Sequence, residues 1–252
     1  MLWTKTKNIL LDIFFPPICL ACQKLLTTGP ARHRPEPKAL AGGPNKLICD
    51  DCLSSIKLNT TLFCPVCRAR LAQNQPICHF DSPYVLGAAG NYDDPVLQNL
   101  IHYFKYKKFE NIAPVLSEIL VRYLENIFRN WELEIRNFIV VPIPLHFWRE
   151  RQRGFNQAKL LGEAMAKHFN LPLILGLKRI KNNKPQIKLK GEEARRKNIA
   201  GCFAIKNPEE IKGKNILLLD DVFTSGATMN EAVKILKAAG ARKIIALVAA
   251  KA

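Results

Sequence analysis

Two acidic side chains followed by a loop of small, hydroxylated residues are the feature of this sequence best suited to chemistry. Residues 216–228 read ILLLDDVFTSGAT, in which Asp220 and Asp221 follow a continuous apolar run. Such a run is typical of a strand buried on both faces, and open α/β sheets bind ligands at the carboxyl ends of their strands. Carboxylates placed there are suited to binding the hydroxyl groups of a sugar.

The loop after the acid pair has the composition of a phosphate-binding site. A glycine lets the backbone approach an anion closely, and the amides at the start of the following helix offer hydrogen-bond donors and the positive end of a dipole. The loop consists of Thr224, Ser225, Gly226, Ala227 and Thr228. An ordinary strand–turn–helix with a capped helix is the alternative. We expect a phosphate site because the acid pair, the loop and the buried strand occur together.

The cysteines predict a metal-binding module in the first third of the chain. Seven of the eight lie between Cys19 and Cys78, and six of them form Cys-x-x-Cys pairs. Two such pairs can complete a tetrahedron of thiolates around zinc. The spacing predicts one site from Cys19, Cys22, Cys49 and Cys52, and three ligands of a second from Cys64, Cys67 and Cys78.

The sequence allows several compositions of the second zinc site. Its fourth ligand is either His79, which directly follows Cys78, or Asp81, which stands where a fourth cysteine would. A degraded second site and an interleaved pairing of the Cys-x-x-Cys units are alternatives. In either case the zinc is expected to be structural, because no cluster of histidines suggests an open catalytic site.

The N-terminus gives no sign of export. The apolar stretch at residues 9–20 contains Asp12 and the pair Pro16-Pro17, is too short to span a bilayer and lacks a cleavage site. We therefore expect a cytoplasmic protein with no membrane span. In that compartment paired Cys-x-x-Cys units usually bind metal instead of forming disulfides.

The elements that must position these groups alternate along the chain. Apolar runs predict strands at residues 84–92, 138–143, 172–177, 216–219 and 244–249, and helical periodicity predicts helices at 97–104, 116–127, 161–168 and 229–239, with a basic loop after residue 143. This alternation is typical of a parallel α/β sheet flanked by helices. The 252 residues fit an α/β domain at 84–252 preceded by a small cysteine-rich module at 1–83.

Residues 216–228 closely resemble the phosphoribosyl pyrophosphate signature of type I phosphoribosyltransferases. Further stretches are similar to the ComF/GntX family: VPIP at 141–144, RERQRGFNQ at 149–157, and Pro185-Gln186, Leu189, Arg195-x-x-Asn198 and Phe203. The cysteine-rich module is similar to that family's double zinc ribbon, so the resemblance covers nearly the whole chain. The chain departs from it by lacking the final cysteine and by an apparent extra residue after Leu189. The extra residue leaves open whether Arg195 or Arg196 faces the ligand.

The resemblance implies a type I phosphoribosyltransferase-like sheet behind a small zinc-ribbon module. It implies a transferase in which a nucleophile displaces pyrophosphate from the sugar, with Mg²⁺ bridging pyrophosphate and ribose oxygens, and an acceptor that the sequence does not name. Asp220 and Asp221 would be the catalytic pair, and residues 224–228 would hold the 5-phosphate. The other substrate-binding residues carried over by position are Arg153, Gly154, Asn156, Gln157, Gln186 and Arg195.

Family members are also linked to uptake of single-stranded DNA in natural transformation, beside a helicase and DNA-processing proteins. The formal charge of +17 favours polyanionic partners, and residues 178–197 hold nine basic side chains against two acidic ones. Basic groups interleaved with aromatic rings, as around Lys105, suit single strands, although a solvated surface is the alternative. Two functions therefore stand: a phosphoribosyltransferase, or a non-catalytic single-stranded-DNA-binding accessory protein of the competence machinery. A wholly disordered chain is excluded, because 48% of the residues are hydrophobic.

Overall fold

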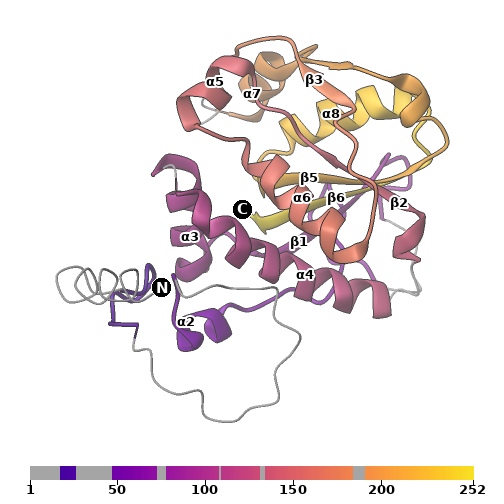
Figure 1. Ribbon diagram of the computed structural model, residues 1–252. Helices are drawn as coiled ribbons and strands as arrows, with labels where there is room; N and C mark the ends of the chain where they lie inside the picture. Colours follow the sequence, from indigo (N-terminus) through magenta and orange to yellow (C-terminus); the bar gives the residue numbers. More distant parts are fainter. Residues whose placement is uncertain (1–17, 27–46, 73–77, 108, 131–133, 184–190) are drawn as a thin grey trace, which may run out of the picture.

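A parallel four-stranded sheet forms the centre of the computed structural model, which describes residues 18–26, 47–72, 78–107, 109–130, 134–183 and 191–252 (Figure 1). The strand order is β1-β6-β5-β2. The strands are β1 (Val85–Asn91), β2 (Phe138–Pro142), β5 (Asn215–Phe223) and β6 (Lys243–Lys251). Every neighbouring pair is parallel, and Leu217 of β5 lies between Val140 and Ile245. The predicted parallel α/β sheet is confirmed.

Helices cover both faces of this sheet, as Figure 1 shows. One face packs against α3 (Pro95–Tyr106), α4 (Ala113–Asn130) and α6 (Gln157–Phe169). The other packs against α8 (Ala227–Ala238) and the antiparallel pair β3 (Leu177–Arg179) and β4 (Phe203–Ile205). Leu217 and Leu219 belong to the first core, and Ile216 and Leu218 to the second. The run ILLL shows no polar alternation because both of its faces are buried.

Two local predictions need correction. The basic stretch after β2 is a helix, α5 (Phe147–Arg153), and not a loop. It forms because the His146 side chain accepts a hydrogen bond from the Trp148 amide and because Gly154, at φ +92°, ends the helix. Residues 172–177 are not a continuous strand, since they pair with the edge of β2 only at Val140 before β3 begins at Leu177.

The remaining helices of the described residues are short. They are α2 (Asp50–Ser55), α7 (Glu192–Ile199) and the 3₁₀ turns η1 (Glu110–Ile112), η2 (Ile135–Asn137) and η4 (Pro208–Glu210). In the part of the chain that the structure describes, no helix combines the length and apolar character needed to cross a membrane.

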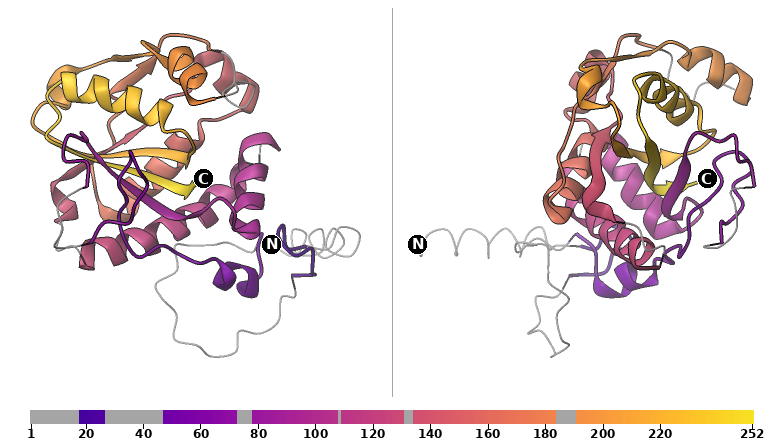
Figure 2. Two further views of the ribbon diagram at one scale, coloured as in Figure 1. Left: turned by 180° about the vertical axis from the view of Figure 1, so that it is seen from behind. Right: turned by 90° about the vertical axis from the view of Figure 1, so that its right-hand side faces the viewer.

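Part of the cysteine-rich segment pairs with the outer edge of β1. Phe63 and Leu86 exchange two backbone hydrogen bonds of 2.7 and 2.9 Å, and the Asn59 amide donates to Ala89 O. The buried Tyr123 hydroxyl of α4 donates to Thr61 O over 2.8 Å. Figure 2 shows the segment in indigo and violet in two further views. Residues 59–63 therefore cover a sheet edge that would otherwise present unpaired backbone groups.

Candidate active site and cysteine clusters

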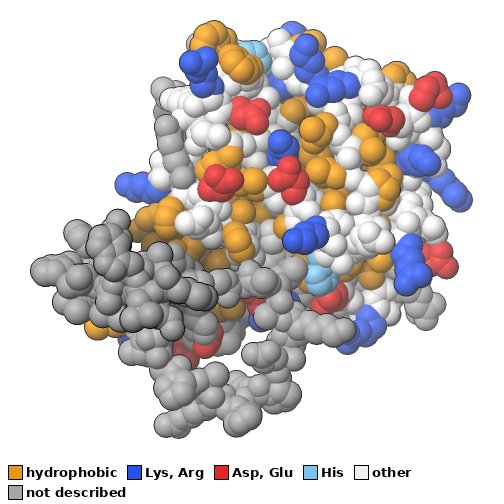
Figure 3. Space-filling model, in the orientation of Figure 1, with side chains coloured by type: hydrophobic (Ala, Val, Ile, Leu, Met, Phe, Trp, Pro, Cys, Tyr) orange, Lys and Arg blue, Asp and Glu red, His pale blue; other side chains and the backbone are white. Residues whose placement is uncertain are grey.

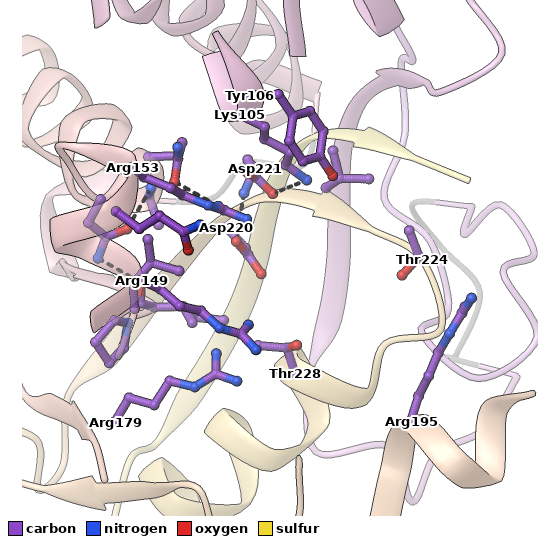
Figure 4. Close-up of a pocket in the computed structure, with 18 of the residues that line it drawn as sticks. Lys105, Tyr106, Arg149, Arg153, Arg179, Arg195, Asp220, Asp221, Thr224 and Thr228 are labelled. Atoms are coloured by element: carbon purple, nitrogen blue, oxygen red, sulfur yellow. Dashed lines mark hydrogen bonds and ion pairs between the residues drawn. The ribbon is translucent and has the colours of Figure 1, made fainter. Parts of the chain in front are cut away.

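A cavity of about 640 Å³ opens where the carboxyl ends of three strands meet (Figure 4). Its walls include Tyr92 after β1, Ile143 after β2, and Asp220 and Thr224 at the end of β5. This is where open α/β sheets bind ligands, because the connections that leave the strands diverge there. The volume is in the range of small-molecule sites.

The acid pair lies inside β5, which continues as far as Phe223. Successive strand residues point to opposite faces, so Asp220 and Asp221 meet different surroundings while both line the cavity. Burial, followed by the charge of Asp221, raises the pKa of Asp220 to about 7, although the Asp221 amide donates a hydrogen bond to Asp220 Oδ1 over 2.9 Å. Asp221 itself is only 6% exposed.

Lys105 pairs with this buried carboxylate. Its Nζ lies 2.9 Å from Asp221 Oδ1, and the two side chains point toward each other in Figure 4. Burial opposes the charge of Lys105, but the carboxylate of Asp221 outweighs it and raises the pKa of Lys105. In the sequence Lys105 stands in a basic patch, and no local pattern predicts its contact with Asp221.

Helix α3 fixes the position of Lys105. Asp94 caps the helix by accepting hydrogen bonds from the amides of Val96 and Leu97, and the helix carries a Pro in its first turn. Its apolar stripe, Leu97, Leu100, Ile101 and Phe104, is fully buried. With that face held against the core, Lys105 in the last turn is directed at the end of β5.

The loop 224–228 joins the end of β5 to α8. Gly226 has φ +74° and serves as the N-cap of α8, without a side-chain capping bond. In the described residues, the amides of Ser225, Gly226 and Ala227 have no hydrogen-bond acceptor. Thr224 and Thr228 line the cavity, and Gly226 and Ala227 line a smaller adjoining space of about 30 Å³. The Ser225 hydroxyl is buried without a partner. Free amides at a helix start suit an anion.

Four arginines enter the cavity from three different elements. Figure 4 shows Arg149 and Arg153 of α5 and Arg179 of β3 on one side, and Arg195 of α7 on the other. Arg179 is 8% exposed, and the Nε atoms of Arg179 and Arg195 are buried without a partner. Burial, followed by the charges of Arg179 and Arg153, lowers the pKa of Arg149. Crowded guanidinium groups with unused donors form a site for a polyanion.

Of the three predicted substrate-binding residues that follow α5, two line the cavity and one does not. Asn156 and Gln157 line the cavity, but Asn156 caps α6 and donates to Ile143 O, and Gln157 donates to Phe104 O and accepts from Arg153. Gly154 ends α5 and is not among the lining residues.

The predicted residues of the basic stretch can be placed only in part. Arg195 lines the cavity, whereas Arg196 is exposed and does not. The substrate-binding prediction for Gln186 lies outside the described residues. Residues that sequence reasoning missed are Lys105, Tyr106, Arg149 and Arg179. Arg149 stood in a family-like run, but no local pattern assigned the others to the cavity.

The first cysteine cluster brings together Cys19, Cys22, Cys49 and Cys52, with all four sulfur atoms within 4.8 Å of one another. The Sγ atoms of Cys22 and Cys49 are 3.8 Å apart. Two sulfurs bound to one tetrahedral zinc at about 2.3 Å would lie about 3.8 Å apart. The donor set therefore fits zinc, and the pairing is the sequential one and not the interleaved alternative.

The second cluster consists of Cys64, Cys67, Cys78 and His79. His79 Nδ1 lies 3.5 Å from Cys64 Sγ and 3.4 Å from Cys78 Sγ, and the sulfurs of Cys67 and Cys78 are 3.3 Å apart. Asp81 is not part of the group. A hydrogen bond from the Ala69 amide, followed by one from Cys78, lowers the pKa of the Cys67 thiol to about 7. This favours the thiolate that zinc binds. The geometry favours His79 as the fourth ligand.

Comparison with known proteins agrees with this architecture. Residues 156–252 match the family model described as the phosphoribosyl transferase domain. Competence protein F of Haemophilus influenzae is 29% identical over 204 residues, covering 78% of this chain and 87% of that protein. Competence protein ComFC of Bacillus subtilis is 29% identical over 209 residues, covering 77% of this chain and 79% of that protein.

Among solved structures, similarity extends to one titled as the allosteric regulatory enzyme of purine biosynthesis. It has a TM-score of 0.35 and 17% identity, covering 71% of this chain and 32% of that one. The present chain thus spans about a third of that enzyme, and the likeness is too distant to inform the site. The relatives named as competence proteins, the phosphoribosyltransferase-type domain and cysteine clusters that fit a zinc ribbon agree with one another. Over about 78% of its length, the chain is therefore similar to the ComF competence proteins.

Proposed function

We propose that this protein binds phosphoribosyl pyrophosphate in the cavity at the end of β5 and acts beside the competence machinery. One observation carries the proposal: the acid pair, four arginines and both ends of the loop, Thr224 and Thr228, line the same cavity, and Gly226 and Ala227, whose amides are free within the described part of the chain, line the small space adjoining it. A ligand with two separate anionic ends and hydroxyl groups between them would use all three groups. The names of the relatives support the link with competence.

Each group in the cavity has a part to play in phosphoribosyl transfer. Loop 224–228 would hold the 5-phosphate, Asp220 and Asp221 the ribose hydroxyls, and Arg149, Arg153 and Arg179 the pyrophosphate. In the reaction, a bond forms between an acceptor nucleophile and the anomeric carbon, while the bond from that carbon to the pyrophosphate oxygen breaks and its electron pair leaves with pyrophosphate. These residues contribute by positioning the sugar and by stabilising charge on the departing group.

Mg²⁺ would have to be held largely by the ligand. Among the described residues, the only groups of three or more metal-binding side chains are the two cysteine clusters. At the cavity, one carboxylate of the acid pair already accepts Lys105. The oxygen chemistry of Asp220 and of a bound pyrophosphate suits Mg²⁺. The ion would neutralise charge on the pyrophosphate oxygens.

Calorimetric titration with phosphoribosyl pyrophosphate, with and without Mg²⁺, tests this proposal. We expect saturable binding that is strengthened by Mg²⁺ and lost in the double variant Asp220→Ala/Asp221→Ala. The variant Glu209→Ala removes an exposed acidic side chain from η4 and serves as the matched control. If the wild-type protein fails to bind the ligand in either condition, the proposal is wrong.

We also propose structural zinc in both cysteine clusters, because their donor sets and spacing fit tetrahedral coordination. Metal analysis of the purified protein should find two equivalents of zinc per chain. Cys22→Ser and Cys67→Ser should each remove one equivalent. If the wild-type protein contains one equivalent of zinc and Cys67→Ser does not change that content, the second cluster does not bind zinc and only the first site stands.

A second candidate function, binding of single-stranded DNA, is favoured by an exposed pair of aromatic rings. Phe147 and Trp148 on α5 are 62% and 61% exposed, with ring centroids 5.6 Å apart, and Arg151 lies on the same helix. Exposed rings beside cations suit unpaired bases. Figure 3 shows further Lys and Arg side chains over one face of the molecule, interspersed with acidic ones.

Binding of a labelled oligonucleotide at several salt concentrations tests this function. Trp148→Ala should weaken binding by about tenfold, since one stacked base contributes about 1–3 kcal/mol. Phe80→Ala removes an aromatic ring that is 83% exposed beside the second cysteine cluster and should have no effect. Affinity that does not change with salt would contradict contact with the phosphate backbone.

A further inference from the structure

Arg68, next to the second cysteine cluster, has an unusual backbone conformation. Its φ is +62°, in the left-handed region that favours glycine over residues with a side chain. The turn that imposes this conformation is closed by the Arg68 amide, which donates to Cys64 O over 2.8 Å. Gln23 holds the same position in the first cluster, with φ +60° and an amide that donates to Cys19 O over 2.9 Å. The conformation therefore belongs to the Cys-x-x-Cys turn, and this turn sets the point from which the Arg68 side chain extends.

The side chain of Arg68 reaches the phosphate loop. Its Nη2 donates to Thr224 O over 2.7 Å, and its Nη1 donates to Ala252 O over 2.8 Å. The guanidinium therefore joins the first residue of the loop to the chain after β6, and Arg68 is separated from Thr224 by 156 positions in the sequence. Arg68 does not line the cavity, so it acts on the loop and not on a ligand.

The bond to Thr224 O affects the donor groups of the loop. The carbonyl of Thr224 and the amide N–H of Ser225 belong to the same planar peptide unit. A cation held at the carbonyl end fixes the orientation of that unit, and polarisation along the peptide strengthens the N–H as a donor. The Ser225 amide is one of the three loop amides without an acceptor in the described part of the chain.

The neighbours of Arg68 are fixed to the sheet. Phe63 is bonded to Leu86 of β1, and Lys251 Nζ lies 4.7 Å from the centre of the Phe63 ring. The Tyr84 hydroxyl bonds to Asn230 Oδ1 of α8 over 2.5 Å. The segment that carries Arg68 is therefore held against β1 and β6, and Tyr84, just before β1, is bonded to the helix that follows the phosphate loop.

We propose that Arg68 is a positioning residue through which the second cysteine cluster holds the phosphate loop in its anion-binding conformation. The cluster fixes the turn, the turn fixes the guanidinium, and the guanidinium fixes the peptide between Thr224 and Ser225. Its effect on ligands rests on the proposed function, whereas its effect on the loop can be measured without any ligand.

The variant Arg68→Gly gives the sharpest test, because glycine suits φ +62° and the turn keeps its geometry while the guanidinium is lost. Arg70→Ala, two residues further along the same segment, is the control for loss of charge. We expect Arg68→Gly to weaken ribose 5-phosphate by about tenfold, the loss typical of a charge-assisted hydrogen bond. Pyrophosphate, which should use the arginines across the cavity, should bind within about twofold of wild type. Arg68→Lys should restore part of the loss.

NMR order parameters of the backbone amides of residues 224–228 in the ligand-free protein provide the second measurement, with metal content as a check. Lower order parameters in Arg68→Gly at unchanged zinc content support the proposal. Unchanged order parameters and unchanged ribose 5-phosphate affinity overturn it, as do equal losses for ribose 5-phosphate and pyrophosphate. If wild type binds neither ligand while the order parameters still respond to Arg68, the proposed function fails and the positioning role stands.

Discussion

At the scale of single residues, the acid pair is electrostatically unbalanced. Two adjacent carboxylates share the cation of Lys105, which lies against Asp221. The pKa of Asp220 rises from 3.8 to about 7, chiefly because the side chain is buried and then because of the charge of Asp221. Perturbed carboxyl groups in a cavity are typical of functional sites. An incoming ligand with hydroxyl groups would meet a pair whose charge changes near neutral pH.

This shift predicts how stability depends on pH. Between about pH 4 and pH 7 the folded protein keeps a proton on Asp220 that the unfolded chain has released, so the contribution of this group to stability is lost as pH rises through 7. Asp220→Asn cannot ionise. Its free energy of unfolding relative to wild type should therefore increase between about pH 5.5 and pH 8.5, as measured by urea denaturation. Asp93→Asn, at an exposed position, is the control. A difference independent of pH would contradict the shift.

Lys105 should stabilise the ionised form of Asp220. Its charge lowers the pKa of Asp220 against the effects of burial and Asp221. Lys105→Met should therefore move the titration midpoint of Asp220 upward, measured by NMR on carboxyl-labelled aspartate. Lys107→Met, at the exposed C-cap of the same helix, should leave that midpoint unchanged. Equal midpoints in Lys105→Met and wild type would show that the ion pair does not act on Asp220.

At the scale of elements, the part of the site contained in one stretch of chain could be predicted. The buried strand, acid pair, small-residue loop and helix start are contiguous, so the pattern at residues 216–228 predicts their order, although β5 continues to Phe223 and α8 already begins at Ala227. Lys105 belongs to α3 and Arg179 to β3. These two elements reach the cavity because they pack against opposite faces of the sheet. No local pattern encodes that approach. The helix α5 was missed because its cap is a histidine, outside the usual set of capping residues.

The phosphate loop between β5 and α8 requires a glycine at position 226. A Cβ on Gly226 would lie 2.7 Å from Phe223 Cζ, and the residue has φ +74°; Gly213 has φ +72° but open space around it. Gly213→Ala should cost about 1–2 kcal/mol from backbone conformation alone. Gly226→Ala should cost about 1–3 kcal/mol more from overpacking. Only the latter should weaken ribose 5-phosphate binding. Equal costs in urea denaturation would show that Phe223 moves aside freely.

At the scale of the whole molecule, the two cysteine clusters support different regions. The first packs beside α3: Cys19, Ile48 and Ile56 share a core with Leu97 and Leu100. The second lies in the segment that pairs with β1 and reaches Thr224 through Arg68. The domain boundary after residue 83 stays a prediction. Hydrogen bonds cross that position at the edge of the sheet, from Asn59 and Phe63 to β1.

Losing one metal site at a time should therefore have regional effects. In the ligand-free protein, Cys22→Ser should speed hydrogen exchange in residues 18–26 and 47–56, where backbone bonds such as that from Leu20 N–H to Leu47 O hold the first cluster together. Cys67→Ser should speed exchange in residues 62–72, and it should also lower the NMR order parameters of residues 224–228, because it releases the turn that carries Arg68. If residues 224–228 are as well ordered in Cys67→Ser as in Cys22→Ser, the cysteine-rich segment is a separate unit and the phosphate loop keeps its shape without it.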